Sequence, residues 1–163
     1  MRRIFPYIFV ISTAFCSSAF ADIVIGRVIG ISDGDTLTLH THDKQQLKVR
    51  LAGIDAPEKG QSFGQASKRN LSELVYGKRV EVEYNKKDRY GRTVGKVLSD
   101  GFDVNLEQVK AGLAWHYKAY EKEQTPSDRI AYAEAEQSAR AARKGLWIDQ
   151  YPIPPWEFRA STK

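Results

Sequence analysis

The sequence predicts one α+β domain, built from five short strands and three helices. Two observations carry this prediction. Polar and apolar residues alternate in several short segments, which is the period of a half-buried strand. Helix start and stop signals lie between and after those segments. Residues 22–163 are numerous enough to enclose one hydrophobic core.

The first expected strand, 23–31, is rich in isoleucine and valine. It leads into Ser32-Asp33-Gly34-Asp35. The second and third strands, 36–39 and 47–51, alternate strictly, and the polar run 42–46 between them suits a hairpin loop. Two further alternating strands are expected at 80–84 and 93–98, joined by the basic loop 85–92.

The first expected helix runs from Lys59 to Gly77, between the third and fourth strands. Ser62 with Gln65 three residues later matches a capping box, and Gly77 is placed as the C-terminal cap. Apolar residues recur along one face of this segment. The order of three strands, one helix and two strands is that of an OB-fold barrel, although strand order alone does not establish a barrel.

Two more helices are expected towards the C-terminus. One is 105–111, with Asn105 as its cap, and the other runs from Thr125 to Lys144 with Pro126 at its first helical position. The proline-rich segment from about 149 is expected to be an extended tail over 151–158, with Trp156 packed back on the domain. Trp115 is also expected to pack in the core.

Residues 1–21 have the organisation of a secretory signal peptide. Arg2-Arg3 precedes an apolar stretch, and Ala19-Phe20-Ala21 provides the cleavage site. The apolar stretch is too short to span a membrane comfortably, so no stable membrane association is expected after cleavage. The expected location is outside the cytoplasm, either periplasmic or secreted, and cleavage removes Cys16, the only cysteine. The formal charge of +5 falls by two with Arg2 and Arg3, which is compatible with a polyanionic partner.

Two carboxylates bracket the predicted hairpin. Asp35 begins the second strand and Asp55 follows the third, so pairing of the two strands brings the carboxylates together. Like charges at one site are costly unless a cation neutralises them. Carboxylate oxygens are hard ligands that suit Ca²⁺ or Mg²⁺, and a cysteine-free chain excludes a sulfur-ligated zinc site.

An arginine and a further carboxylate accompany this pair. Arg50 offers a rigid fork of donors for phosphate, and Glu58 follows a proline beside Asp55. Arg50 and Asp55 are five residues apart and would face opposite sides of a regular strand, so we expect a bulge at Ala52-Gly53. Metal, arginine and free carboxylate are the groups needed for attack of water on a phosphodiester.

We considered two other interpretations of the segment 33–58. An ordinary polar hairpin would contain Asp-Gly as a turn signal without any chemistry. An EF-hand requires glycine at the sixth position of its loop, and counting from Asp33 gives Thr38, so the EF-hand fails.

The segment 33–58 and the run Asp88-Arg89-Tyr90-Gly91-Arg92 together resemble the two signature motifs of the staphylococcal nuclease family, in order and in spacing. The similarity continues to Gly145-Leu146-Trp147 and covers essentially the whole chain after the signal peptide. This resemblance implies a five-stranded OB-fold barrel with three helices.

The resemblance also implies roles for individual residues. Asp35 and Asp55 match the ligands of Ca²⁺, and Ala56 stands where a backbone carbonyl also binds the metal. Arg50, Glu58 and Arg92 match the catalytic positions. In the loop, Arg89 and Tyr90 match contacts to a terminal phosphate of the nucleotide. A nucleotide-contacting tyrosine is expected near 117–120, where Tyr117 and Tyr120 both compete.

The expected function is a calcium-dependent endonuclease that cuts DNA and RNA to 3′-phosphate products and prefers single strands. The protein is expected to be a monomer. The alternative is a catalytically inactive OB-fold protein that binds single-stranded nucleic acid. The presence of Arg50, Glu58 and Arg92 at the family's three catalytic positions favours the enzyme. A calcium-dependent glycosidase is a weaker alternative, because it gives Arg50 and Arg92 no task.

Overall fold

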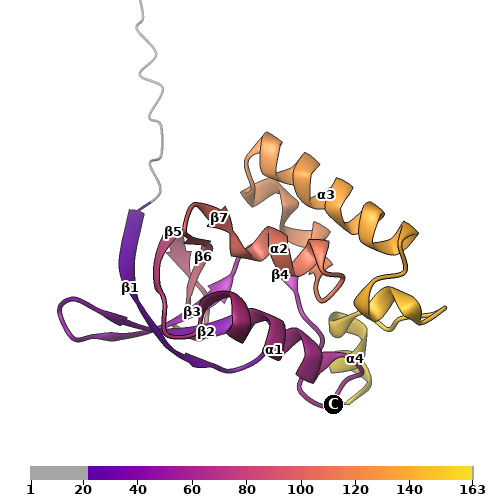
Figure 1. Ribbon diagram of the computed structural model, residues 1–163, viewed down its shortest axis with the longest axis horizontal. Coiled ribbons are helices and arrows are strands. Elements are labelled where there is room, and N and C mark those ends of the chain that lie inside the picture. Colours follow the sequence, from indigo (N-terminus) through magenta and orange to yellow (C-terminus); the bar gives the residue numbers. More distant parts are fainter. Residues whose placement is uncertain (1–21, 163) are drawn as a thin grey trace, which may run out of the picture.

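The computed structural model describes residues 22–162, and the predicted signal peptide, residues 1–21, lies outside the described residues. Five strands curl into a closed barrel at the centre of the domain (Figure 1). Their bounds are β1 Asp22–Ile31, β2 Thr36–Thr41, β3 Gln46–Leu51, β5 Arg79–Lys87 and β6 Thr93–Ser99.

The barrel has the strand order β3-β2-β1-β5-β6. Neighbours in this order are antiparallel, as in the pairing of Val28 with Leu39. A parallel pairing of β3 with β6, which places Val49 opposite Thr93, closes the sheet on itself. Closure leaves neither β3 nor β6 as an open edge. The predicted OB-fold barrel is therefore confirmed.

The remaining elements are short strands and helices around the barrel. Two-residue strands are β4 Ile54–Asp55, β7 Phe102–Asp103 and β8 Trp115–His116, and β4 pairs with β8. Instead of the three expected helices, residues 22–162 form four α-helices and two 3₁₀ helices: α1 Gly64–Val75, α2 Val104–Lys110, α3 Pro126–Ala141, α4 Pro155–Ser161, η1 Lys118–Glu123 and η2 Gly145–Ile148.

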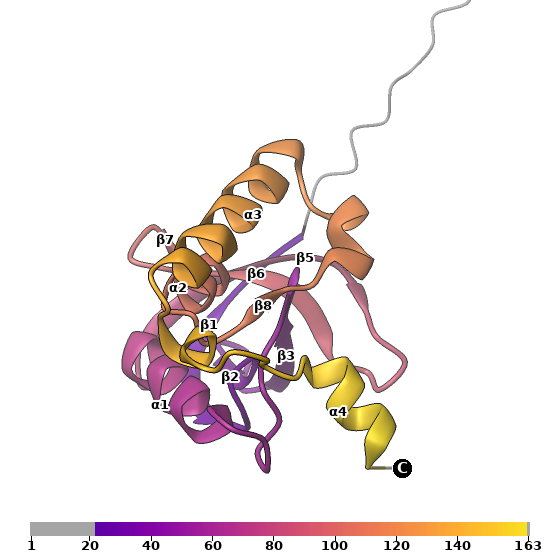
Figure 2. The same ribbon diagram turned by 90° about the vertical axis from the view of Figure 1, so that its right-hand side faces the viewer.

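The helices cover one side of the barrel, as the two views in Figures 1 and 2 show. Helix α2 contacts β6, α1 and α3, so it lies between the barrel and α3. The main core joins the inner faces of the strands to α1, α2 and α3. A smaller cluster contains Trp115, Trp147 and Leu146, and Trp156 packs against it. The predicted packing of Trp115 and Trp156 is thus confirmed.

The predicted start of α1 is wrong. The helix begins at Gly64, and its N-cap is Phe63 in a left-handed conformation, with φ 65° and no side-chain cap. Phe63 packs against the small tryptophan cluster. This tertiary contact fixes the chain's entry into the helix, so Ser62 does not cap it. The helix ends at Val75, with Tyr76 as the C-cap directly before Gly77.

The predicted cap of α2 is also wrong. Asp103 caps the helix and accepts a hydrogen bond from the N–H of Leu106 at 3.0 Å. Asn105 is fully buried, and its amide bonds the barrel instead: it donates to the carbonyls of Ala52 and Gly95 at 3.0 and 3.1 Å and accepts from the N–H of Val97 at 3.1 Å. Asn105 therefore ties α2 to β6 and to the turn after β3.

The start of α3 is confirmed, since Thr125 accepts from the N–H of Asp128 at 3.1 Å and Pro126 opens the helix. The helix ends at Ala141 rather than Lys144. The extended tail expected over 151–158 is wrong, because Pro155 begins α4. Across residues 22–162 we find no helix with the length and apolar character needed to cross a membrane.

Replacing Asn105 with alanine should lower the free energy of unfolding by roughly 2–4 kcal/mol, because the change removes three hydrogen bonds that a fully buried amide makes with Ala52, Gly95 and Val97. Lys110→Ala, on the exposed face of the same helix, should change stability by less than about 0.5 kcal/mol. Urea unfolding at constant pH measures both. Equal stabilities for the two variants would contradict this account of the buried amide.

Candidate active site

Asp35 and Asp55 meet at one end of the barrel. Asp35 directly precedes β2, and its carbonyl accepts a hydrogen bond from the N–H of Leu51 at the end of β3, at 2.8 Å. Its carboxylate accepts from the N–H of Ala56 at 2.7 Å. Asp55 lies in β4, which pairs with β8. The backbone thus fixes both carboxylates, as the hairpin argument predicted.

Arg50 links the two carboxylates. Its Nη2 lies 3.1 Å from Oδ2 of Asp35 and 2.8 Å from Oδ1 of Asp55. Its Nη1 donates to the backbone carbonyls of Leu51 and Ile54 at 2.9 and 3.0 Å. One guanidinium therefore bridges both acids and is itself held by the turn between β3 and β4.

The connection between Arg50 and Asp55 is a turn rather than the expected bulge. Strand β3 ends at Leu51, β4 begins at Ile54, and Gly53 between them has φ 72°, a backbone conformation that other residues rarely adopt. A Cβ at Gly53 would also lie 2.4 Å from Nε2 of Gln124. The predicted consequence, Arg50 and Asp55 on the same side, is confirmed.

The loop before Asp35 packs closely on two helices. A Cβ on Gly34 would lie 1.8 Å from the hydroxyl of Ser67 in α1. The side chain of Gln108 in α2 donates to the carbonyl of Gly34 at 2.5 Å and to that of Ser67 at 3.1 Å. Glycine is needed here because the backbone approaches the helix so closely. These contacts fix the position of the backbone next to Asp35.

Burial raises the pKa of Asp35 to about 7. The positive charge of Arg50 opposes this shift, whereas the nearby carboxylates of Asp33 and Asp55 add to it. A buried carboxyl of this kind stays ionised at neutral pH only when a cation offsets the cost of burial. A cation bound beside Asp35 and Asp55 would therefore stabilise the ionised form of Asp35.

Glu58 reaches the cluster through an arginine that the sequence analysis did not assign. Oε1 of Glu58 lies 2.7 Å from Nη1 of Arg159, and the same guanidinium lies 2.8 Å from Oδ2 of Asp55. Arg159 belongs to α4. The run Pro154-Pro155-Trp156-Glu157 has the proline and early acidic residue of a helix start, and that signal could have revealed the helix. Nothing local predicts where the helix docks.

The basic loop between β5 and β6 carries its own ion pair. Nε of Arg92 lies 2.7 Å from Oδ2 of Asp88, and within residues 22–162 Arg92 pairs with no carboxylate of the cluster. Tyr90 is 68% exposed, and the guanidinium groups of Arg89 and Arg92 lie 4.9 and 5.5 Å from its ring centre. The loop is an exposed surface with two arginines around one aromatic ring.

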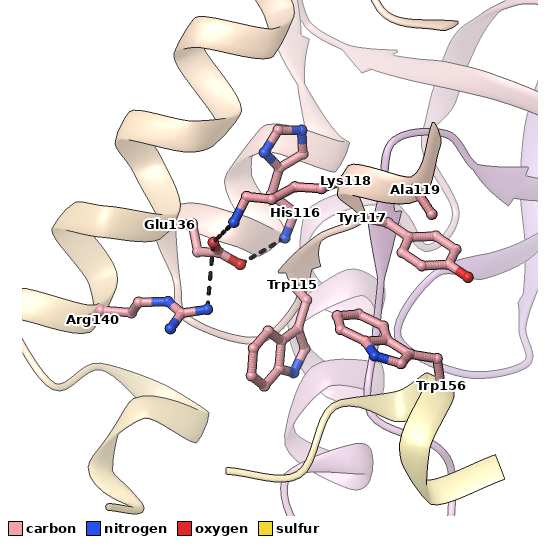
Figure 3. A pocket seen from close by; sticks show the side chains of 8 residues that line it. All are labelled: Trp115, His116, Tyr117, Lys118, Ala119, Glu136, Arg140 and Trp156. Atoms are coloured by element: carbon pink, nitrogen blue, oxygen red, sulfur yellow. Dashed lines mark hydrogen bonds and ion pairs between the residues drawn. The ribbon is translucent and has the colours of Figure 1, made fainter. Parts of the chain in front are cut away.

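Tyr117 lies next to the cluster. Its N–H donates to the carbonyl of Gly53 at 2.8 Å, and burial together with the negative charge of Asp55 raises the pKa of its hydroxyl. The rings of Tyr117 and Trp156 are stacked, 5.3 Å apart with an interplanar angle of 13° (Figure 3). Tyr120, the competing candidate, contacts the edge of Tyr117 at 5.1 Å.

His116, which received no role from the sequence, is structural. It is buried, and its Nε2 lies 2.8 Å from Oε1 of Gln124. Its backbone N–H donates to the carboxylate of Glu136. Glu136 also pairs with Lys118 at 2.7 Å and with Arg140 at 3.5 Å, as Figure 3 shows. A cavity of about 320 Å³ lies beside Tyr117. Its lining includes His116, Lys118, Glu136, Arg140, Trp115 and Trp156.

The donor chemistry at Asp35 and Asp55 fits a hard divalent cation. Both acids are buried and offer only oxygen, and Ala56 adds a backbone carbonyl to the same turn. In the part of the chain that the structure describes, no three histidine, cysteine or acidic side chains gather as a metal site.

Comparison with known proteins gives a consistent result. The family described as staphylococcal nuclease homologue matches residues 48–149. A Haemophilus influenzae protein named as an uncharacterized endonuclease is 49% identical over 137 residues, which is 84% of this chain and 74% of that protein. An Escherichia coli protein with the same description is 38% identical and covers 98% of both chains. A micrococcal nuclease of Shigella flexneri is 39% identical over 85% of this chain and 82% of its own length.

The barrel, the carboxylate–arginine cluster and these relatives define a phosphodiester hydrolase that acts on nucleic acid. The chain belongs to the staphylococcal nuclease family, and it is an endonuclease.

Replacing Asp35 with asparagine should stabilise the protein in EDTA, increasingly as the pH rises. Because the pKa of Asp35 is raised to about 7 in the folded state from an ordinary 3.8, the folded protein binds the extra proton. Its contribution to stability is therefore full below pH 4 and lost as the pH rises to 7. At pH 8 the free energy of unfolding of Asp35→Asn should exceed that of the wild type by on the order of 1–3 kcal/mol.

Urea unfolding at pH 4, 6 and 8 measures this difference. Asp100→Asn is the matched control, because Asp100 is an exposed carboxylate in a turn with φ 52°, which asparagine tolerates. A stability difference for Asp35→Asn that stays constant across these pH values would show that burial does not perturb Asp35.

Proposed function

We propose that the protein is an exported, calcium-dependent endonuclease that hydrolyses DNA and RNA and leaves 3′-phosphates. The observation that carries this proposal is the cluster at the end of the barrel, where Asp35, Asp55 and Glu58 are gathered by arginine side chains. Two buried acids, a more exposed acid and a fixed guanidinium match the needs of phosphodiester hydrolysis.

Asp35, Asp55 and the carbonyl of Ala56 are the proposed holders of Ca²⁺. Both side chains are almost completely buried, and the backbone fixes both, so their separation is set before any ligand arrives. Bound there, Ca²⁺ would supply a positive charge that polarises a phosphate oxygen. Alanine at position 56 keeps the carbonyl that this role requires.

Glu58 is the proposed partner of the attacking water. Its side chain is 36% exposed, in contrast to 1% for Asp55, so water can reach it. It lies three residues after Asp55 and directly follows Pro57, which stiffens the chain there. From there its carboxylate can orient a water molecule and accept its proton.

Arg50 and Arg92 are the proposed donors to the phosphoryl oxygens. Arg50 is held by four contacts from its two terminal nitrogens, which fixes its direction. Arg92 is 28% exposed in its side chain and lies on the loop that also presents Arg89 and Tyr90. In this proposal Arg92 exchanges Asp88 for phosphate, while Arg89 and Tyr90 contact the terminal phosphate and Tyr117 contacts the nucleotide.

Single-stranded substrates are favoured in this proposal because the acids lie at one end of an OB-fold barrel. An OB-fold accommodates a single strand along one face, with aromatic rings available for stacking. The proposed contacts go to phosphate and sugar, so both DNA and RNA qualify. Export rests on the predicted signal peptide, and one small domain suits a monomer.

Lysine in place of Arg50 should lower turnover by about 10²–10³, because a point charge cannot reproduce two donors in a fixed fork. Affinity for single-stranded DNA in Ca²⁺ should fall far less. Steady-state hydrolysis of a labelled oligonucleotide gives the turnover, and fluorescence anisotropy gives the affinity. Arg79→Lys is the matched control, since Arg79 is an exposed arginine of β5 away from the cluster, and it should leave both quantities unchanged.

The same measurement on Arg92→Lys should give a similar loss of turnover. If Arg50→Lys and Arg92→Lys instead kept their turnover and lost only affinity, both arginines would be phosphate anchors and the catalytic assignment would move elsewhere.

Single-stranded DNA and A·T-rich duplex should be cut faster than G·C-rich duplex, and RNA should also be cut, because a duplex must open before one strand enters the site. Cleavage of all four substrates should stop in excess EGTA and return when Ca²⁺ is restored. A phosphatase treatment of the products, followed by end labelling, identifies the 3′-phosphate. Full activity in EGTA would refute calcium dependence, and cleavage at one fixed sequence would refute the substrate model.

A further inference from the structure

Helix α4 lies outside the segment that the nuclease family matches, yet it reaches the active site. The family match ends at residue 149, and α4 spans Pro155–Ser161. Figure 2 shows the chain crossing in front of the strands towards α4. On the way, the carbonyl of Ile153 accepts a hydrogen bond from the side chain of Gln61 at 2.5 Å, close to Glu58. The C-terminal segment is thus attached to the loop that carries the proposed catalytic acid.

Arg159 contacts both functional acids on this side of the cluster. Its Nη2 lies 2.8 Å from Oδ2 of Asp55, and its Nη1 lies 3.2 Å from Oδ1 of Asp55 and 2.7 Å from Oε1 of Glu58. A bidentate contact of this kind occupies the carboxylate oxygens of Asp55 that a metal ion would use. It also occupies the oxygen of Glu58 that would face water. Arg50 also contacts Oδ1 of Asp55, at 2.8 Å.

Trp156 covers the proposed nucleotide contact. Its ring is stacked on Tyr117, and it meets the edge of Trp115 at a centroid distance of 5.5 Å. Figure 3 shows the indole of Trp156 between these two rings, projecting from α4. A nucleobase that stacks on this face of Tyr117 needs the place that Trp156 fills. One short helix therefore blocks both the acids and the aromatic surface beside them.

The attachment of α4 is weak enough to be reversible. The helix has seven residues, and only Pro155 among them is buried. Helices of this length are not stable by themselves in water, so α4 keeps its shape only while it is docked. Its docking depends on the ion pairs of Arg159, the stacking of Trp156 and the bond to Ile153, which is the kind of local structure that opens without global unfolding.

We propose that α4 is an autoinhibitory strap, in which Arg159 stands in for a cation on Asp55 and Glu58 while Trp156 stands in for a nucleobase on Tyr117. The inference rests on the calcium-dependent function proposed above. In the docked state the acids are neutralised and the stacking surface is covered. Ca²⁺ and a nucleic-acid strand compete with the strap for the same groups, so the site becomes active when both are present and α4 lifts.

The strap predicts that two separate variants strengthen Ca²⁺ binding. If docking is favoured about tenfold, the apparent affinity for Ca²⁺ is reduced by about that factor, and loss of docking restores it. Arg159→Ala and Trp156→Ala should therefore each bind Ca²⁺ about tenfold more tightly than the wild type in the absence of nucleic acid. Isothermal titration of the chain from residue 22 with CaCl₂ measures the affinity.

Trp156→Ala is the decisive variant, because Trp156 does not touch the acids. Removal of the positive Arg159 would strengthen cation binding by local electrostatics even without a strap, whereas removal of Trp156 acts only by loosening α4. Arg69→Ala controls for net charge, since Arg69 is exposed on α1, and it should leave the affinity unchanged. Circular dichroism confirms that each variant is folded.

A second readout follows the helix itself. Ca²⁺ should change the tryptophan emission of the wild type, and the change should be absent from Trp156→Phe. Unchanged Ca²⁺ affinity in Trp156→Ala would overturn the strap, as would a lower kcat in Arg159→Ala at saturating Ca²⁺ with unchanged Ca²⁺ affinity, which would make Arg159 a substrate-binding residue. If neither the wild type nor Arg159→Ala binds Ca²⁺, the proposed calcium dependence fails, and the strap fails with it.

Discussion

The shared ion pair of Asp35 and Asp55 with Arg50 is the interaction on which the rest of the site depends. Two buried carboxylates within reach of one nitrogen repel each other, and burial raises the pKa of Asp35. Arg50 offsets this cost because its other nitrogen is held by carbonyls of the turn 51–54. The end of β3, the turn and β4 are therefore bound into one unit by the same group that neutralises the acids.

Buried polar side chains from the helices support this unit from behind. Gln108 bonds the loop that carries Asp35, and Asn105 bonds the turn that carries Asp55. Both are fully buried, and each makes at least two hydrogen bonds. Such networks are favourable only when every member is satisfied, which ties the position of α2 to the position of both acids. The site is thus stabilised by groups that take no part in its chemistry.

Opposite charges at the site are close to balanced by the protein itself. Asp35, Asp55 and Glu58 meet Arg50 and Arg159, so the acids do not stand as free negative charges. A resting site of this kind costs less stability than one with unpaired buried acids. It also means that any cation arriving at Asp55 must replace an existing partner, and this exchange is the physical basis for regulation by the C-terminal helix.

The sequence by itself determined the barrel strands, the approach of Asp35 to Asp55 and the side on which Arg50 lies. The alternation of polar and apolar residues fixes which face of a strand is buried, and a hairpin fixes which strand ends meet. Both features depend on residues that are close in sequence. The sequence also placed Thr125 and Pro126 correctly, because their capping chemistry involves only neighbouring residues. The family resemblance supplied the barrel closure that the strand order left open.

Only the tertiary structure decided the features that depend on distant contacts. Ser62 and Asn105 have the chemistry of caps, but Phe63 enters the tryptophan cluster and the amide of Asn105 finds three barrel partners, so both capping predictions failed. The tail became a helix for the same reason. Arg159 finds Asp55 across 104 residues of chain and Trp156 finds Tyr117, and no local pattern encodes a contact at that separation.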